Sequence, residues 1–155
     1  MIDQTGLQYT VHIFGCTNST IRVIGKINAV SMGMFSFVTS HHTTDQAYDT
    51  VGCKKTALVM ESAVSSLSIT SSPSFEVQIT GTVPTVQVDT TDSGQVYLSK
   101  ECMDIVEIIT SKTSSINISV PTGDEGDFVE NALPEQIKST FKNGKVVSEI
   151  VEHAG

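Results

Sequence analysis

The sequence is short of charge and of basic residues in particular, and this shortage excludes several classes of protein. Charged residues make up 17% of the 155 residues, and nine Lys and Arg stand against 17 Asp and Glu, which leaves a formal net charge of −8. A chain with so few, dispersed cations is unsuited to neutralising phosphates, so we expect neither nucleic acid nor an anionic membrane as a partner. No apolar run approaches the ~20 residues that cross a bilayer.

Cysteine is also scarce, and its pattern argues against a disulfide scaffold. The three cysteines are Cys16, Cys53 and Cys102, an odd number with no Cys-x-x-Cys spacing. The first five residues, MIDQT, have neither the basic nor the apolar segment of a signal peptide. Both observations predict a cytoplasmic protein with free thiols.

What the chain does contain is an apolar repeat with a period of about 20 residues. Pairs of apolar residues two positions apart recur at Ala57/Val59, Val77/Ile79, Val96/Leu98 and Ile116/Ile118. A second pattern recurs as Ile27-Val30-Met32, Val64-Leu67-Ile69, Val83-Val86-Val88 and Met103-Val106-Ile108. Spacing by two is typical of a strand, so Val77 and Ile79 are predicted to point inward while Glu76 and Gln78 face water.

A turn of this length cannot bury its apolar side alone and must stack on the next turn, about 4.8 Å away. We therefore predict an all-β protein, a right-handed parallel β-helix or solenoid, in which helix is scarce. A sandwich of short antiparallel strands is the alternative, but it does not require the same pattern to return every 20 residues.

The whole chain, 1–155, is predicted to be a single domain with two departures from the repeat. Residues 33–50 exceed the repeat and are predicted to form an inserted loop. Residues 122–155 are predicted to be an acidic excursion followed by a C-terminal hairpin, which turns at Asn143-Gly144. Because an uncovered solenoid end aggregates, this hairpin is expected to cover one.

Catalytic and metal patterns are weak. His41 and His42 with Asp45 and Asp49 do not have the two separated ligand pairs of a zinc site, so a solvated loop is expected there. Glycoside chemistry would need clustered acids, and the candidates on adjacent turns are Asp89, Asp92, Glu101, Asp104 and Glu107. We expect no enzyme activity, no cofactor and no metal.

Lysines near the predicted corners are the remaining candidates for a binding surface. Stacked turns are expected to bring them to a common edge, which would suit an acidic protein partner, although solvated lysines are an equally simple explanation. These residues are Lys26, Lys54, Lys55, Lys100 and Lys112. Arg22 is the single arginine, and a lone arginine can serve as an arginine finger on a bound GTPase.

Over nearly its whole length the sequence resembles the C-terminal domain of cyclase-associated proteins. The segments that carry this resemblance are GKIN (25–28), GCKKT (52–56), GTVPT (81–85), VYLSK (96–100), PEQ (134–136) and EIVEHAG (149–155). The stretch 33–50 departs from the family pattern, which passes almost directly from the strand ending at Met32 to the Gly-Cys-Lys-Lys corner.

The resemblance implies a parallel β-helix that forms a homodimer by exchanging its C-terminal hairpin, and we expect Val146, Val147, Ile150 and Val151 to make that contact. It also implies binding to monomeric actin, in the ADP form by preference, and exchange of ADP for ATP, which recycles monomers for filament turnover in the cytoplasm. The expected actin contacts are Lys26, Lys54, Lys55, Lys100, Val151, Glu152, His153, Ala154 and Gly155.

Two other functions stay open on the sequence alone. The related tubulin-cofactor-C-like domains share this solenoid and stimulate GTP hydrolysis through an arginine, for which Arg22 is the candidate here. A purely structural dimerisation module is the other alternative, and it would not release nucleotide from ADP-actin.

Overall fold

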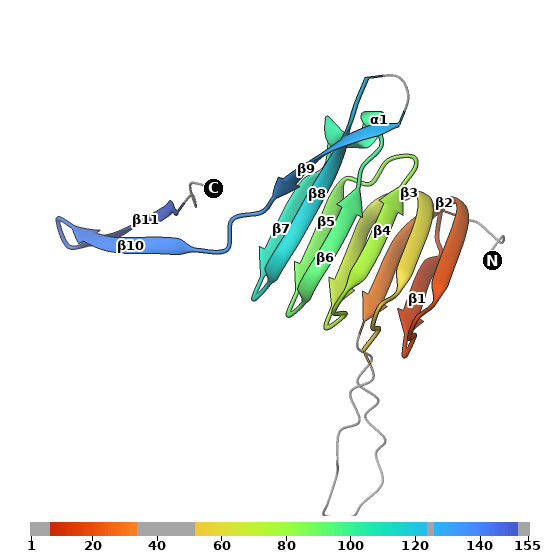
Figure 1. Cartoon of the computed structure of the whole chain (residues 1–155), viewed down its shortest axis with the longest axis horizontal. Helices are drawn as coiled ribbons and strands as arrows, with labels where there is room; N and C mark the ends of the chain where they lie inside the picture. The colour runs from red at the N-terminus through yellow and green to blue at the C-terminus, as the bar shows by residue number, and fades with distance from the viewer. Residues whose placement is uncertain (1–6, 34–51, 124–125, 152–155) are drawn as a thin grey trace, which may run out of the picture.

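The computed structural model describes residues 7–33, 52–123 and 126–151, and these residues are almost entirely β-structure. Figure 1 shows the strands stacked side by side, with one hairpin projecting from the end of the stack. The elements are β1 (Thr10–Phe14), β2 (Thr20–Gly33), β3 (Ala57–Thr70), β4 (Phe75–Ile79), β5 (Thr85–Asp89), β6 (Asp92–Tyr97), α1 (Lys100–Met103), β7 (Glu107–Ser111), β8 (Ser114–Thr122), β9 (Asp127–Ala132), β10 (Ile137–Lys142) and β11 (Lys145–Ile150).

Two parallel sheets run along the stack, and the long strands β2 and β3 contribute to both because their pairing register shifts near the middle of each strand. Sheet A contains residues 20–23 of β2, residues 57–60 of β3, β4, β6 and β8. Sheet B contains β1, residues 29–33 of β2, residues 66–70 of β3, β5 and β7. This arrangement confirms the predicted parallel β-solenoid.

The core lies between the two sheets. In β4 the side chains of Val77 and Ile79 are buried while Glu76 and Gln78 are exposed, as the alternation predicted. Each fully buried Val or Ile contributes about 1.5–3 kcal/mol to folding, so a continuous inward column of such residues holds the turns together.

The pairing of β3 with β4 shows that the predicted inward residues of β3 are wrong by one position. The expected inward pair Ala57/Val59 is wrong, since both residues are only partly buried. Leu58 and Met60 are buried instead, because they are in register with the buried Val77/Ile79 pair of β4.

The second pattern was also predicted wrongly at two positions, where the inward residue is the one just before the predicted residue. Val64 and Met103 are exposed, and Ala63 and Cys102 take the inward positions beside them. Leu67 follows Ala63 by four residues, and the partly buried Val106 follows Cys102 by four, whereas Val86 follows Val83 by three. The apolar residue three positions before Leu67 or Val106 therefore points outward.

The length of the turns varies more than the sequence pattern indicated. The offset between paired residues is 19 from β3 to β4 and from β4 to β6, but 22 from β6 to β8 and 37 from β2 to β3. The 22-residue turn contains α1. The predicted inserted loop at 33–50 falls almost wholly within 34–51, which lies outside the described residues.

Sheet B leads into sheet A through a corner that we call the lysine corner, formed by residues 15–18, 52–55, 71–74, 90–93 and 112–115. Its last positions pair from turn to turn and all have positive φ: Asn18 48°, Lys55 49°, Ser74 59°, Ser93 59° and Ser115 52°. This backbone is unfavourable for residues other than glycine. Hydrogen bonds between turns offset the cost, for example from the Lys55 amide to the Pro73 carbonyl at 3.1 Å.

Sheet A leads back to sheet B through the opposite corner, which we call the helix corner, formed by residues 24–26, 61–62, 80–84 and 99–106. Pro84 lies here, outside the strands, where the amide it lacks removes no hydrogen bond from either sheet. Ser99 caps α1, because its hydroxyl accepts a hydrogen bond from the Cys102 amide at 3.0 Å.

The two sheets end differently at the C-terminal end of the stack. In sheet A, β9 pairs antiparallel with β8 and covers its edge. In sheet B, no described strand pairs with the outer edge of β7. Beyond β9, β10 and β11 form a separate antiparallel hairpin (Figure 1).

Candidate functional site

The predicted lysines occupy two different edges of the solenoid. Lys54 and Lys55 are exposed at the lysine corner, and Lys112 lies on a later turn of the same corner. Lys26 and Lys100 are exposed at the helix corner, on the first and fourth turns of that edge. The expectation of one common lysine edge is therefore corrected: pairing of the strands places these cations on opposite corners.

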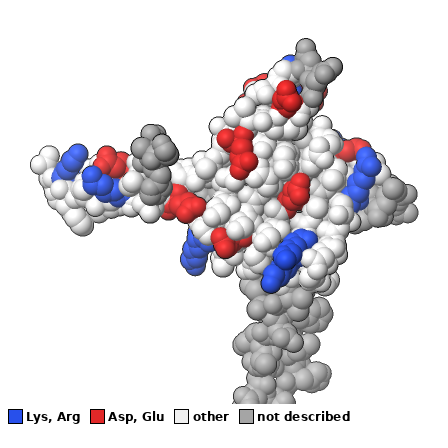
Figure 2. Space-filling model, in the orientation of Figure 1, with Lys and Arg blue, Asp and Glu red and all other residues white. Residues whose placement is uncertain are grey.

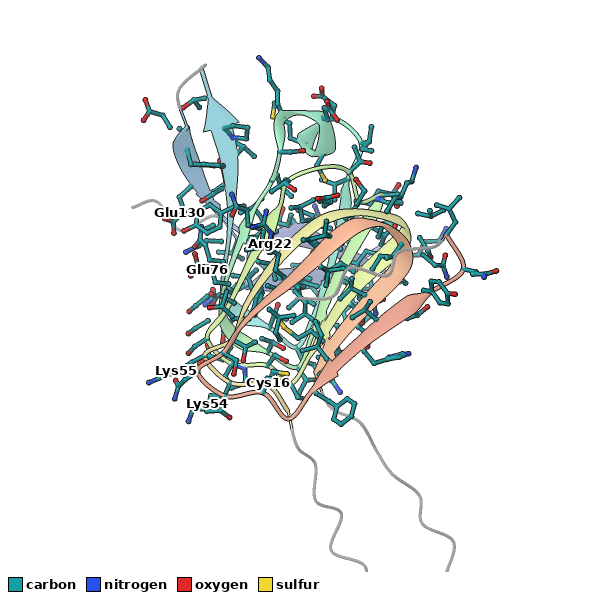
Figure 3. The ribbon with its side chains drawn as sticks, turned by 90° about the vertical axis from the view of Figure 1, so that its right-hand side faces the viewer. Cys16, Arg22, Lys54, Lys55, Glu76 and Glu130 are labelled. Atoms are coloured by element: carbon teal, nitrogen blue, oxygen red, sulfur yellow. The ribbon has the colours of Figure 1, made fainter. Side chains whose placement is uncertain are left out.

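Arg22 lies on the strand that pairs with the one following Lys54 and Lys55, and its partner Val59 is four residues beyond Lys55, roughly 13 Å along the strand. It is exposed on the outer face of sheet A, in register with Val59. Figure 3 shows Arg22, Lys54 and Lys55 on the same side of the molecule. No acidic side chain among the described residues forms an ion pair with any of the three. Three unpaired cations thus lie at the N-terminal end of sheet A.

The outer face of sheet A continues from these cations into a shallow, polar trough of about 500 Å³. Its floor is made by side chains that are in register across successive strands: Glu76 on β4, Gln95 on β6 and Asn117 on β8. The Gln95 amide donates a hydrogen bond to the Ser119 hydroxyl at 2.6 Å, and Asn117 donates one to the Glu130 carboxylate. The trough therefore presents carboxamides and carboxylates with their positions held.

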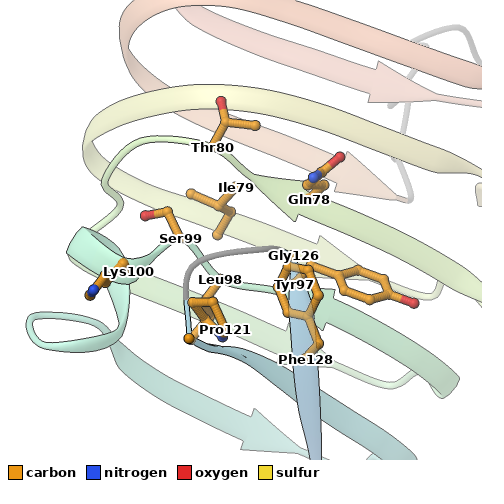
Figure 4. Close-up of a pocket in the computed structure, with 11 residues that line it drawn as sticks. Gln78, Ile79, Thr80, Tyr97, Leu98, Ser99, Lys100, Pro121, Gly126 and Phe128 are labelled. Carbon is orange, nitrogen blue, oxygen red and sulfur yellow. The ribbon is translucent and has the colours of Figure 1, made fainter.

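A second hollow, of about 320 Å³, adjoins the trough at Tyr97. It is lined by the apolar groups of Leu98, Pro121 and Phe128 and is bordered by Lys100 (Figure 4). The rings of Tyr97 and Phe128 meet edge to face, with centroids 5.4 Å apart. An apolar side chain with a neighbouring anionic group fits this combination of residues.

The carboxylates and cysteines that the sequence singled out do not come together among the described residues. Asp89 ends β5 just before the lysine corner, and Asp92 lies within it. Glu101 and Asp104 lie at the helix corner and Glu107 begins β7, so the five candidate carboxylates do not share one corner. Burial raises the pKa of the fully buried Cys102 thiol, which disfavours its nucleophilic form. No group of three metal-ligating side chains occurs in the described ranges. His41 and His42 lie outside them.

The hairpin carries an exposed apolar face. Ile137 pairs with Ile150 and Phe141 with Val146, so these four side chains lie on one face, with Ser139 and Ser148 between them. Their exposed fractions are 70%, 59%, 79% and 60%, respectively. The opposite face holds the Lys138–Glu149 ion pair, at 3.2 Å.

The predicted dimer residues are divided between these faces. Val146 and Ile150 belong to the apolar face, while Val147 is in register with Thr140 on the other. The Val151 amide donates a hydrogen bond to the Gln136 carbonyl at 3.0 Å, which closes the base of the hairpin. Glu152, His153, Ala154 and Gly155 lie outside the described residues.

Sequence reasoning missed four residues of these surfaces. Ile137 and Phe141 alternate with polar residues just before the Asn-Gly turn, a signal that could have identified them. Tyr97 and Phe128 come together only because β9 folds back on β8, and no local pattern predicts that contact.

No helix among the described residues has the length and apolar character needed to cross a membrane.

Comparison with known proteins gives a consistent result. The model of the family "Adenylate cyclase associated (CAP) C terminal" matches residues 1–39 and 46–153. Adenylyl cyclase-associated protein of Schizosaccharomyces pombe is 38% identical over 154 residues, covering 99% of this chain and 24% of that protein. Adenylyl cyclase-associated protein 1 of Bos taurus is 36% identical over 155 residues, covering 100% of this chain and 29% of that protein.

The fold agrees with these matches. The crystal structure of a cyclase-associated protein from Cryptosporidium parvum superimposes with a TM-score of 0.77 at 28% identity, covering 92% of this chain and 76% of that one. The chain thus spans about a quarter of the length of the curated relatives it matches.

Proposed function

The chain belongs to the adenylate cyclase-associated (CAP) C-terminal family, and on this premise we propose that it binds monomeric actin and promotes exchange of bound ADP for ATP. The observation that carries the proposal is the family match over nearly the whole chain. The protein then acts in the cytoplasm by binding, without a covalent step, and returns actin monomers to the pool that feeds filaments.

The outer face of sheet A is the surface we assign to actin. Actin is acidic, and Arg22, Lys54 and Lys55 present three cations at one end of this face, none of them in an ion pair with another described residue. At the other end, the hollow beside Tyr97 and Lys100 can receive an apolar side chain next to an anionic group. Figure 2 shows isolated basic residues among scattered acidic ones on the face that it presents, so no broad field of one sign opposes docking there.

Exchange follows from the rigidity of the solenoid. Its turns are joined by backbone hydrogen bonds along both sheets, so the face cannot adapt equally to two shapes of a partner. A surface that binds the open-cleft state of actin more tightly than the closed state raises the population from which ADP leaves. The rate of nucleotide release therefore rises with occupancy of the complex.

The hairpin is assigned to self-association. A two-stranded hairpin with a bare apolar face is marginal on its own, and exposed apolar patches of this kind mark interfaces. The unpaired edge of β7 offers backbone donors and acceptors that a strand from a second copy can use. We therefore propose a homodimer in which each hairpin packs on the partner.

The test is release of a fluorescent nucleotide from monomeric ADP-actin, with and without the chain. We expect release to accelerate and then saturate as the concentration of the chain rises. Binding without faster nucleotide release would contradict the proposed exchange activity and favour a purely structural role. No binding at all would refute the whole proposal.

Removing the cations of the lysine corner is expected to weaken actin binding about tenfold, the effect of two charges at an interface rim. The variant is Lys54→Gln with Lys55→Asn, because asparagine tolerates the positive φ of 49° at position 55. The matched control is Lys112→Asn, which removes one lysine at φ 51° on a distant turn of the same corner. Equal loss in both variants would mean that only net charge matters.

The C-terminal tail is the second proposed contact. Deleting Glu152–Gly155, which lie outside the described residues, is expected to weaken actin binding several-fold and to leave the β-sheet circular dichroism unchanged, because the tail follows the last strand. Unchanged affinity would remove the tail from the contact surface and leave the assignment of sheet A standing.

A further inference from the structure

Two of the three cysteines occupy equivalent positions on neighbouring turns of the lysine corner. Thr17 and Lys54 form a parallel bridge, which places the preceding residues, Cys16 and Cys53, directly opposite each other. The Lys54 amide donates to the Cys16 carbonyl at 2.8 Å and so fixes this register. Neighbouring strands lie about 4.8 Å apart, inside the 4.4–6.8 Å range of Cα separations that a disulfide spans.

Both thiols also donate hydrogen bonds to carbonyl groups at the end of β1. The Cys53 thiol donates to the Ile13 carbonyl at 3.6 Å and the Cys16 thiol donates to the Phe14 carbonyl at 3.6 Å. These two carbonyls are consecutive at the end of β1. The thiol of Cys53 lies within hydrogen-bonding reach of that of Cys16. The two sulfur atoms therefore lie near each other on the same side of the corner.

We propose that Cys16 and Cys53 form a dithiol site that a small anionic disulfide oxidises to an intrachain disulfide bond. Cys16 is partly exposed and is the point of entry, whereas Cys53 is 1% exposed. Lys54 and Lys55 follow the buried thiol directly and attract an oxidant that carries carboxylates.

The reaction balances with the oxidant alone. The Cys16 thiolate attacks one sulfur of the small disulfide, forming a mixed disulfide and expelling one small thiolate, which takes up the proton that Cys16 lost. Cys53 then loses its proton and attacks the Cys16 sulfur, which expels the second small thiol. The protein loses two hydrogen atoms, and one small disulfide becomes two thiols.

The surrounding corner indicates why this pair differs from the third cysteine. On the next two turns the same position is occupied by Ser72 and Thr91, whose hydroxyls donate to the carbonyls two residues back at 3.0 and 2.8 Å. A hydroxyl therefore satisfies this position, and two thiols are not needed for its hydrogen bonds. Cys102 lies on the helix corner, where its thiol donates to the Val83 carbonyl and has no second thiol beside it.

Burial raises the pKa of the Cys53 thiol above its ordinary value, even though hydrogen bonds to neighbouring backbone oppose this effect. Cys53 is thereby kept from reacting directly with the oxidant, and it reacts only after Cys16 has formed the mixed disulfide.

The experiment exposes the reduced chain to oxidised glutathione, blocks free thiols with an alkylating agent and maps the linkage by peptide mass spectrometry. We expect a Cys16–Cys53 linked peptide in the wild type and in the control Cys102→Ser, reversed by a dithiol reductant. In Cys16→Ser, Cys53 is expected to stay unmodified. Serine is the matched substitution because Ser72 occupies the same position on a later turn.

Thermal unfolding provides a second measurement that does not depend on how the variants fold. The disulfide joins two turns across a long loop, and oxidation of the wild type is expected to raise Tm by roughly 10 °C. Glutathione retained on Cys16, a linkage to Cys102, or a linkage between chains would overturn the proposal. An oxidised wild type whose Tm does not rise would overturn it as well.

Discussion

Replacing Phe141 and Ile150 by serine is expected to convert the proposed homodimer into a monomer of 16.6 kDa. The two side chains lie on the apolar face of the hairpin and include the largest exposed apolar side chain of each strand. Burying each one at an interface contributes about 1.5–3 kcal/mol, so losing both weakens association by roughly a thousandfold.

The measurement is the mass in solution by analytical ultracentrifugation between 1 and 100 times the dissociation constant of the wild type. The control is Lys142→Ser with Lys145→Ser, a pair of opposed residues on the other face of the same hairpin. It is expected to remain dimeric. A wild type that is monomeric throughout, or a dimer that survives both serine substitutions, would contradict the assignment of the hairpin to self-association.

Gly94→Ala is expected to destabilise the fold by about 3 kcal/mol, the upper range for overpacking a core. Gly94 pairs with Phe75 on β4, and a methyl group at position 94 would meet the Cε1 atom of the Phe75 ring at 2.0 Å. The ring is 3% exposed and is enclosed by the core, so it cannot swing away. The collision is therefore relieved only by displacing β4 or β6.

The free energy of unfolding in urea tests this prediction. A second variant that replaces the Phe75 ring by a smaller side chain tests whether the ring causes the loss. Phe75→Leu in the Gly94→Ala background is expected to recover part of the loss, although Phe75→Leu alone destabilises the wild type. The control is Gly144→Ala, where the added methyl group meets nothing within 4 Å and only the φ of +73° is unfavourable. That variant is expected to cost about 1 kcal/mol. Equal losses at both glycines would show that backbone strain, and not the ring, is responsible.

The hairpin illustrates how far local sequence predicts local structure. Asn143-Gly144 predicted a tight turn, and both residues have positive φ, 51° and 73°, as a two-residue turn of this kind requires. The turn sets the register and thereby divides the apolar side chains between two faces. Alternation within the last strand already separates Val147 from Val146 and Ile150. The sequence did not show that Ile137 and Phe141 join Val146 and Ile150 on one face, because that depends on the pairing of β10 with β11.

The repeat shows the same limit at the scale of the whole stack. Its period and the alternation within each strand were sufficient to predict stacked parallel turns, since backbone pairing and burial both require them. The phase was predicted correctly at Val77/Ile79 but wrongly at Ala57/Val59, because neighbouring residues of similar apolar character can both fit a two-residue alternation. Only the pairing with β4 selects Leu58 and Met60 as the inward residues.

The low number of charged residues limits how large a cationic surface this protein can have. With nine basic residues, any cationic patch must be small, and composition alone argued against a phosphate-binding surface. The sequence by itself also determined the stacked β-architecture, because the period of the apolar residues is a local property of the chain.

Tertiary structure decided which cations act together. The pairing of β2 with β3 places Arg22 and the Lys54–Lys55 pair in the same sheet and at the same end of the stack, whereas Lys26 and Lys100 are carried to the opposite corner. It likewise brought Cys16 beside Cys53 and Phe75 beside Gly94. The physical reason is that neighbours across a solenoid are set by the number of residues in each turn, and these turns range from 19 to 37 residues.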